Sequence, residues 1–303
     1  MTADVALLTS LTTPLQYEFF QKGLAVATLS GALLGFIGVY ITLRGMSYIG
    51  HGLSHAIFGG FAAASLVSAS FIYVGAGVWG VASALSINWV TRKHRIGADA
   101  AIGVITTASF ALGVALLSKF GSTGPSFDNA LFGSIFGISF DQIAMLAGVT
   151  AATVAFVVLR YRSLLFTTFD PEVAAASGVN VSRIEALLML LLSLSILATL
   201  TVIGVTLVAA MLVIPAVVAR MVTDSFRRML VISTTTGALC GLVGMYVSYF
   251  AAVPSGTMIV LTGAAVFCVV LAWQGWRSLT RTIGFDDHAD EPSTDHATSR
   301  SAT

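Results

Sequence analysis

Long apolar runs without charged residues dominate this sequence, and they constrain its fold more than any other feature. Hydrocarbon offers the backbone no hydrogen-bond partner, so each crossing of a bilayer must be a helix of about 20 apolar residues or a strand of a closed barrel. The uninterrupted length of the runs indicates helices. Of the 303 residues, 56% are hydrophobic and 10% charged, against roughly 25% charged in a soluble domain, so a soluble enzyme is excluded.

Nine apolar segments are separated by charged residues, proline and glycine, and each is expected to be a transmembrane helix. They are residues 21–43, 47–66, 70–90, 98–117, 141–159, 184–202, 205–221, 229–251 and 257–275. The second contains two histidines and many glycines, and the seventh is short, so eight spans with one re-entrant segment are the alternative. Gly204 should end the sixth span, and Pro215 should kink or unwind the seventh near residues 211–214, because proline removes a backbone hydrogen bond. The predicted fold class is all-α, a polytopic bundle of eight or nine transmembrane helices.

The basic residues are distributed very unevenly between the two sides of this nine-span bundle. Lys22 and Lys119 lie on one side, and the other 13 of the 15 lysines and arginines lie on the opposite side. Short loops rich in lysine and arginine stay in the cytoplasm. The sequence therefore predicts a multi-pass membrane protein surrounded by lipid, with its N-terminus outside and its C-terminus in the cytoplasm.

Two segments are expected to lie outside the spans. The outer loop over residues 121–140 is apolar at its centre, residues 129–136, which should form a short interfacial helix or else plug part of a vestibule. Residues 278–303 are polar and should form a disordered cytoplasmic tail. The predicted domains are thus a transmembrane domain over 1–277 and a tail over 278–303.

The chain lacks the groups that would let it power transport by itself. Its three lysines occur as QKG, RKH and SKF, so the Gly-Lys-Ser/Thr of a phosphate-binding Walker loop is missing. Secondary transporters place ionisable coupling residues in the middle of their spans. Apart from two histidines, the spans of this chain have almost no ionisable group away from their ends. We therefore expect a separate ATPase and no enzymatic activity in this chain. The net charge of +1 gives no indication of nucleic-acid binding.

His51 and His55 are the ionisable residues placed deepest in a span. Their spacing of four stacks both imidazoles on one helix face about 6 Å apart, which is a chelating geometry near mid-bilayer. Hydrogen bonding of each ring to a backbone carbonyl is the structural alternative. Two side chains make half of a tetrahedral site, and a twofold dimer would supply four nitrogens. The glycines around the pair should let neighbouring helices approach closely, at positions Gly50, Gly52, Gly59 and Gly60.

Four motifs follow one another along the chain: RGMSYIGHGLSHAIFGGFA, AAIGVITTASFALGVALLS, FDPEVAAASGV and VIGVTLVAAMLVIPAVVARMVTD. Together they resemble the permease subunits of ABC transporters that import manganese, zinc or iron. The usual family motif has Gly-Asp, three residues and His-Ala, so its His corresponds to His55 and its Asp position is occupied by His51. The resemblance implies a metal path at the axis of a homodimer, separate ATPase subunits and an extracytoplasmic metal-binding protein. No permanently bound cofactor is implied, and the transported ion would be Zn²⁺, Mn²⁺ or Fe²⁺.

The substitution at position 51 bears on which ion is carried. Carboxylate oxygen suits manganese, whereas imidazole suits zinc and the later first-row metals. A constriction built from imidazoles alone therefore favours zinc over manganese or iron.

The segment between the fifth and sixth spans contains a predicted short helix on the basic side. Asp170 is a suitable N-cap, Pro171 and Glu172 fit the first turn, and Gly178 can close the helix in the left-handed conformation after about two turns. An amphipathic connector is the plain interpretation. The resemblance instead implies a coupling helix that docks on the ATPase, with contacts over residues 169–178, which include Phe169, Asp170, Pro171, Glu172, Ala175 and Gly178.

Two other classes of protein fit the same composition. An ion-coupled secondary cation transporter would work without any ATPase and should show inverted internal repeats. A membrane scaffold would carry out no transport. Association with a nucleotide-binding subunit distinguishes the permease from both.

Overall fold

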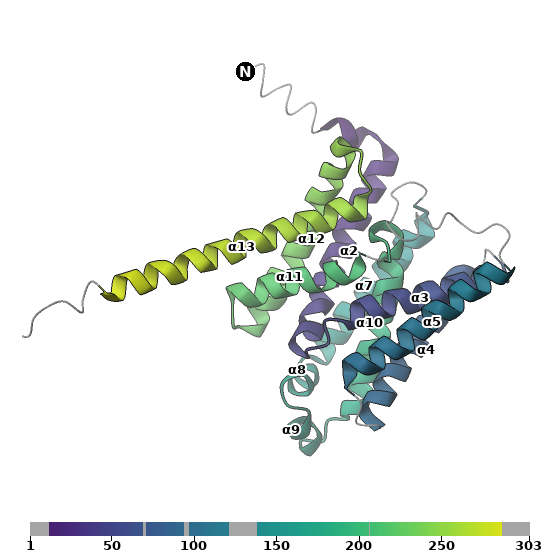
Figure 1. Ribbon diagram of the computed structural model, residues 1–303, viewed down its shortest axis with the longest axis horizontal. Coiled ribbons are helices and arrows are strands. Elements are labelled where there is room, and N and C mark those ends of the chain that lie inside the picture. Colours follow the sequence, from purple (N-terminus) through teal and green to yellow (C-terminus); the bar gives the residue numbers. More distant parts are fainter. Residues whose placement is uncertain (1–11, 69–70, 94–96, 121–137, 206, 287–303) are drawn as a thin grey trace, which may run out of the picture.

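The computed structural model describes residues 12–68, 71–93, 97–120, 138–205 and 207–286. Each predicted span coincides with a helix (Figure 1): α2 (Glu18–Leu43), α3 (Ile49–Ser65), α4 (Ile72–Lys93), α5 (Ala98–Phe120), α7 (Phe140–Leu159), α10 (Val181–Ile203), α11 (Val208–Val222), α12 (Phe226–Ala251) and α13 (Ser255–Asp286). A 3-10 turn, η1 (Thr13–Gln16), precedes α2. The all-α prediction is confirmed.

Seven of these helices are long and apolar enough to cross a membrane. The other two are α3, with 17 residues, and α11, with 15. They correspond to the second and seventh predicted spans, which the sequence already marked as the least regular. Shorter helices at membrane depth are tolerated where protein rather than lipid surrounds them, and both helices are largely buried.

Helix α2 is the central element of the bundle. Two thirds of its apolar stretch is buried, and α7, α10, α11 and α12 all pack against it. Glycines allow close contacts with α12: a Cβ atom on Gly31 would overlap the carbonyl oxygen of Gly237. One turn after Gly31 on α2, the carbonyl oxygen of Gly35 accepts a hydrogen bond of 2.5 Å from the hydroxyl of Ser233 in α12. The α2–α12 contact is therefore backbone against backbone, as in other small-residue interfaces of membrane helices.

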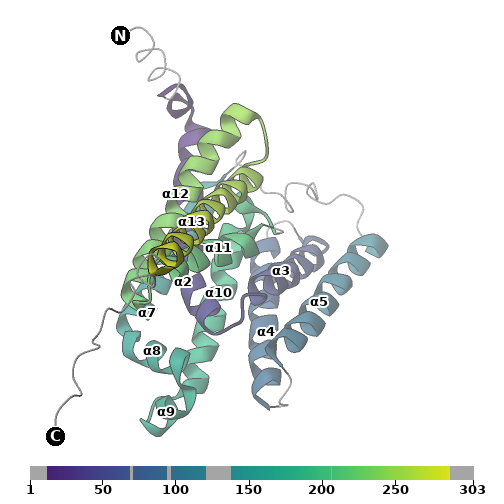
Figure 2. The same cartoon turned by 60° about the vertical axis from the view of Figure 1, so that its left-hand side comes forward.

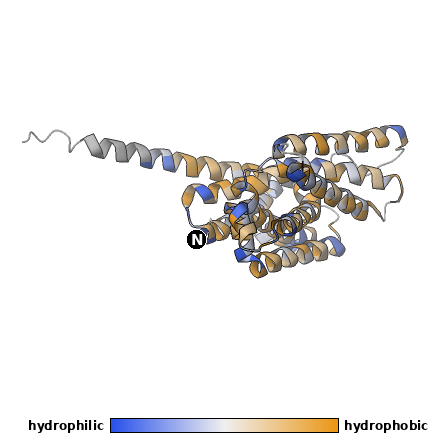
Figure 3. Cartoon of the chain, turned by 90° about the horizontal axis from the view of Figure 1, so that it is seen from below, coloured by the Kyte–Doolittle hydropathy of each residue, from blue (hydrophilic) through white to orange (hydrophobic). Residues whose placement is uncertain are grey.

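The remaining helices lie on two sides of this centre. Helices α3, α4 and α5 pack on one another on one side, and α7 and α12 lie on the other (Figure 2). Hydrophobic residues predominate along the helices (Figure 3), and many of them point outward, such as Val158 and Leu159 of α7 with 67% and 81% exposure. Such apolar exposure is expected where lipid contacts the protein.

The end of α10 agrees with its prediction, whereas the path of α11 differs from its prediction. Gly204 ends α10 with a φ of +85°, as expected. Of the two predicted effects of Pro215, unwinding near residues 211–214 is wrong, because α11 runs through Pro215 without interruption, and a kink stays a prediction. Pro215, Met211 and Leu212 are buried. Packing on several neighbours holds the helical path although proline removes one hydrogen bond.

The two segments predicted outside the spans have different outcomes. The helix expected at residues 129–136 lies outside the described residues. Of the tail expected from residue 278, residues 287–303 lie outside the described residues, and α13 continues to Asp286, projecting beyond the other helices (Figure 1). Neither proline nor glycine interrupts residues 278–283, and Arg277 stacks over the ring of Trp273 at 4.2 Å, so the helix has no stop signal there.

Candidate functional site

Helix α3 places the two histidines side by side. His51 lies in the first turn of the helix and His55 one turn later, so the 3.6-residue period brings them to the same face. Their ring centroids are 4.5 Å apart, and the ring planes cross at 75°. The predicted pairing is therefore present in the structure, somewhat closer than the 6 Å typical of this spacing.

Aromatic rings flank the histidine pair on both sides. The ring of Phe110 in α5 lies 5.0 Å from that of His55, and the ring of Tyr48 lies 5.4 Å from that of His51. Both histidines are partly buried, whereas Tyr48 is 53% exposed. His55 thus sits against an apolar wall and His51 lies nearer the open end of the pair.

One chain places two imidazole rings together here. Among the residues that the structure describes, His, Cys, Asp and Glu form no group of three or more that could hold a metal ion. The nearby hydroxyl of Ser54 is engaged with the carbonyl oxygen of His51 at 2.8 Å. A tetrahedral site would need two more ligands from outside the described chain.

The glycines around the histidines make the close helix contacts that the sequence predicted. A Cβ atom at any of the four would overlap a neighbouring helix: Gly50 with Leu212, Gly52 with Ile102, Gly59 with the Ser109 carbonyl, and Gly60 with Trp79. These contacts bring α3 against α11, α5 and α4 at once. They hold the face that carries the histidines in a defined orientation.

The predicted short helix is α9 (Pro171–Ala176), which lies at one end of the bundle (Figure 2). The Asp170 carboxylate accepts a hydrogen bond from the backbone N–H of Val173 at 2.9 Å, which is the expected N-cap. Gly178 has a φ of +81°, as its predicted left-handed role requires. At six residues the helix is slightly shorter than the expected two turns.

Most of this segment is exposed. Within α9 only Ala174 is buried, and Glu172 and Ala175 are exposed. Phe169 and Val173 are 62% and 48% exposed. The segment therefore exposes apolar side chains beside polar ones.

A second helix, α8 (Tyr161–Phe169), leads directly into α9 and was not predicted. Its sequence, YRSLLFTTF, is too short and too polar for a span, and only Leu164 and Thr167 are buried. Helices shorter than about 12 residues depend on tertiary packing for their stability, so local pattern alone gave a weak signal.

An ion-pair cluster near these two helices was also missed by sequence reasoning. Glu185 of α10 contacts Arg44 at 3.6 Å and Arg92 at 2.5 Å, which joins α10 to the ends of α2 and α4. The Nε of Arg44 also donates to the hydroxyl of Thr168 in α8 at 3.4 Å. The sequence held one signal for this cluster: Glu185 is a lone acidic residue near the start of an apolar helix.

Arg44 is the buried member of this cluster, with 7% of its side chain exposed. Burial lowers the pKa of its guanidinium, and the Glu185 carboxylate opposes that shift. One of its terminal nitrogens, Nη2, has no hydrogen-bond partner among the described residues. The Glu185 carboxylate is therefore the main group that stabilises the buried positive charge of Arg44.

Known proteins resemble this chain over most of its length. The family model described as the ABC 3 transport family matches residues 16–274. The manganese transport system membrane protein MntC of Halalkalibacterium halodurans is 38% identical over 255 residues, covering 84% of this chain and 87% of the relative. A probable iron transport system membrane protein of Haemophilus influenzae is 31% identical over 260 residues, covering 86% and 95%.

A solved structure agrees with the fold as well. PsaBC from Streptococcus pneumoniae in complex with Fab contains a chain that is 31% identical, with a TM-score of 0.77, covering 87% of this chain and 95% of that one. The length of the matches, the sequence identities and the shared fold all point to the same group of proteins. The chain belongs to the ABC 3 transport family, and it is a multi-pass membrane permease of ABC transporters.

Proposed function

We propose that this chain is the membrane subunit of an ATP-driven importer of divalent transition-metal ions, in which His51 and His55 line the metal path. The observation that carries the proposal is the pair of imidazoles 4.5 Å apart on one face of α3. Two rings at this distance can both contact one cation. The bundle has almost no other ionisable group at this depth, so the pair is the natural place for a charged substrate.

Two copies of the chain complete the site in this proposal. Each copy offers two nitrogens, and a twofold axis beside α3 would bring four imidazoles together. An extracytoplasmic metal-binding protein delivers the ion, and two separate ATPases drive the change of access. The chain itself makes and breaks no covalent bond, so it has no enzymatic role.

The membrane is the inner membrane of a bacterium, with the N-terminus outside and the C-terminus in the cytoplasm. The 13 to 2 division of basic residues supports this orientation. It also places α8 and α9 on the cytoplasmic side, where an ATPase would bind. The exposed Phe169 and Val173 and the capped α9 support that contact.

Zinc is the ion that the donor set favours. Imidazole nitrogen at both positions suits zinc, and the carboxylate usual in the family motif would suit manganese better. Manganese is the second candidate, because several relatives are named for manganese transport. Competitive uptake of zinc, manganese and iron by the reconstituted assembly decides between them.

Association with an ATPase tests the class of transporter. Asp170→Arg removes the cap of α9 and reverses its charge, so the variant should no longer co-purify with the nucleotide-binding subunit. Asp170→Asn keeps an N-cap oxygen and is the matched control, which should retain association. ATP-independent transport by the isolated chain would instead indicate an ion-coupled secondary cation transporter.

Metal uptake tests the histidines separately from assembly. His55→Ala should abolish uptake while the complex with the ATPase stays intact. Ser65→Ala, on the same helix with a hydroxyl bonded only to its own backbone, is the control and should leave uptake unchanged. Normal uptake by His55→Ala would reject the ligand role.

A further inference from the structure

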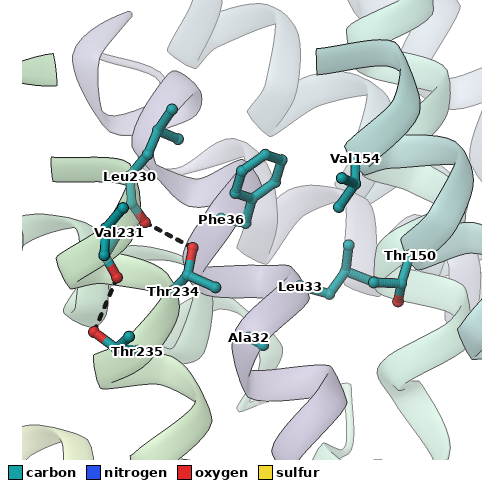
Figure 4. A pocket seen from close by; sticks show the side chains of 9 residues that line it. All are labelled: Ala32, Leu33, Phe36, Thr150, Val154, Leu230, Val231, Thr234 and Thr235. Carbon is teal, nitrogen blue, oxygen red and sulfur yellow. Dashed lines mark hydrogen bonds between the residues drawn. The ribbon is translucent and has the colours of Figure 1, made fainter. Parts of the chain in front are cut away.

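An apolar groove crosses the outer face of α2 between α7 and α12. Its volume is about 330 Å³. Ala32, Leu33 and Phe36 of α2 form its floor, and residues of α7 and α12 form its two walls (Figure 4): Thr150, Val154, Leu230, Val231, Thr234 and Thr235. Val154 and Val231 are 41% and 60% exposed, so the groove opens to the surroundings of the helices.

The interior of the groove offers no free polar group to a ligand. Each of its three threonine hydroxyls donates to a backbone carbonyl of its own helix: Thr150 to Leu146 at 2.7 Å, Thr234 to Leu230 at 2.7 Å and Thr235 to Val231 at 2.9 Å. The threonines therefore present their methyl groups. A hydrocarbon chain fits this lining, whereas a polar solute would lose hydrogen bonds to water.

One end of the groove carries four arginines. The ring of Tyr161, just after α7, lies 5.9 Å from that of Phe226, the first residue of α12, so the two walls meet there. Arg160 and Arg162 flank Tyr161, and Arg227 and Arg228 follow Phe226. All four are exposed. None of the four forms an ion pair within the described residues.

The depth of the groove suits a lipid held at these arginines. Val154 and Thr150 precede Arg160 by six and ten residues, and the rise of 1.5 Å per residue puts them about 9 to 15 Å along α7. One leaflet contributes about 15 Å of hydrocarbon. The arginines thus lie at headgroup level and the groove lies among the acyl chains of the same leaflet.

The groove faces away from the histidine pair. Helix α3 packs mainly against α4, α5, α10 and α11, and none of these helices lines the groove. Figure 2 shows α3 and α5 on the opposite side of α2 from α7 and α12. A second copy that meets this chain at the histidines leaves the groove open to lipid.

We infer that the α7–α12 groove binds an anionic phospholipid, with one acyl chain in the groove and the phosphate at Arg160, Arg162, Arg227 and Arg228. The apolar lining of the groove explains why it would hold an acyl chain. The four arginines, which form no ion pair within the described residues, would attract the negatively charged phosphate. A lipid bound here bridges α7 and α12 across the central helix. It would therefore support the position of α7, which leads directly into α8 and α9.

Photolabelling tests this site in the full-length chain reconstituted in phosphatidylcholine nanodiscs. The probes are phosphatidylglycerol and phosphatidylcholine with the same diazirine-bearing acyl chain, and labelled residues are mapped by mass spectrometry. Phosphatidylglycerol should label residues 150–154 and 230–235 at least about fivefold more strongly, because each arginine near the surface favours an anionic lipid by a factor of this size. Excess inorganic phosphate should leave the labelling unchanged, because it cannot occupy the groove.

Matched variants separate the groove from its charged end. Val154→Trp should fill the groove and remove the labelling, and Ala152→Trp on the opposite, exposed face of α7 should not. Arg160→Gln with Arg228→Gln removes two of the four charges and should lower the preference for phosphatidylglycerol over phosphatidylcholine by at least about fivefold. Arg183→Gln with Arg220→Gln removes the same charge elsewhere and should preserve the preference.

Three results would overturn the inference. Equal labelling by both lipids in the unaltered chain would show hydrocarbon contact without headgroup recognition. Displacement by inorganic phosphate would show an anion site without a lipid. Labelling elsewhere, with a cross-link between two chains through α7 and α12, would show that a second copy covers the groove. If Val154→Trp does not fold, the arginine variants still decide the outcome.

Discussion

His51 and His55 share a helix face but differ in their surroundings. His55 lies between the His51 ring and the apolar Phe110, whereas His51 lies next to the exposed Tyr48. A ligand held against an apolar wall has little freedom to move. We therefore expect position 55 to be required for binding any ion and position 51 to influence which ion is preferred.

His51→Asp should shift transport toward manganese, because it replaces an imidazole nitrogen with a carboxylate oxygen. The measurement is uptake of manganese and zinc in direct competition, expressed as the ratio of the two ions. His51→Ala removes the imidazole without adding oxygen and is the control, which should lower uptake of both. An unchanged ratio in His51→Asp would remove the argument for zinc.

Glu185→Gln should destabilise the protein by leaving the buried Arg44 charge without its main partner. Breaking a fully buried pair costs roughly 3–5 kcal/mol, and we expect about 2 kcal/mol here because the carboxylate is partly solvated. The free energy of unfolding in detergent micelles measures this change. Arg92 is 42% exposed, so Arg92→Gln should cost less than about 1 kcal/mol. Equal losses in both variants would contradict the central role of Arg44.

Among the elements, α2 and α12 pack backbone against backbone, because glycines leave no side chain between them at their contact. Gly31 and Gly237 face each other, and a Cβ on either would overlap the carbonyl oxygen of the other. Lipid provides no hydrophobic driving force between helices, so close packing and interhelical hydrogen bonds must provide it. The Ser233 to Gly35 bond is one such hydrogen bond.

Gly237→Ala should therefore lower the free energy of unfolding by about 2 kcal/mol through overpacking. Gly148→Ala in α7 is the matched control, since no atom lies within 4 Å of its added Cβ. The control should be neutral or slightly stabilising, because alanine is the better helix former. Denaturation of both variants in the same micelles makes the comparison, and equal stability would contradict the packing argument.

At the element scale the sequence predicted the spans well and the connections less well. The nine apolar segments became helices because membrane length and backbone satisfaction leave the chain no other choice. The α9 cap was also local, since Asp170 bonds to a backbone group three residues away. Helix α8 and the unbroken α11 were missed, because each depends on packing against distant residues rather than on local pattern.

For the whole molecule, the proposed metal site needs ligands from more than one chain. Two imidazoles per chain predict one metal ion bound per two chains. Elemental analysis of the purified protein equilibrated with zinc, together with its molar mass in detergent, gives this ratio. His55→Ala should reduce bound zinc to background, and one ion per chain in the unaltered protein would contradict a shared site.

The sequence by itself determined the helical class, the positions of the spans, the α9 cap and the spacing of the histidines. These features depend on composition and on residues a few positions apart, so hydropathy and helical periodicity are sufficient to predict them. Tertiary structure alone decided that Glu185 meets Arg44 and Arg92, that α11 passes through Pro215 intact and that an apolar groove lies between α7 and α12. Each of these depends on contacts between residues far apart in the chain, which exist only once the helices have packed around α2.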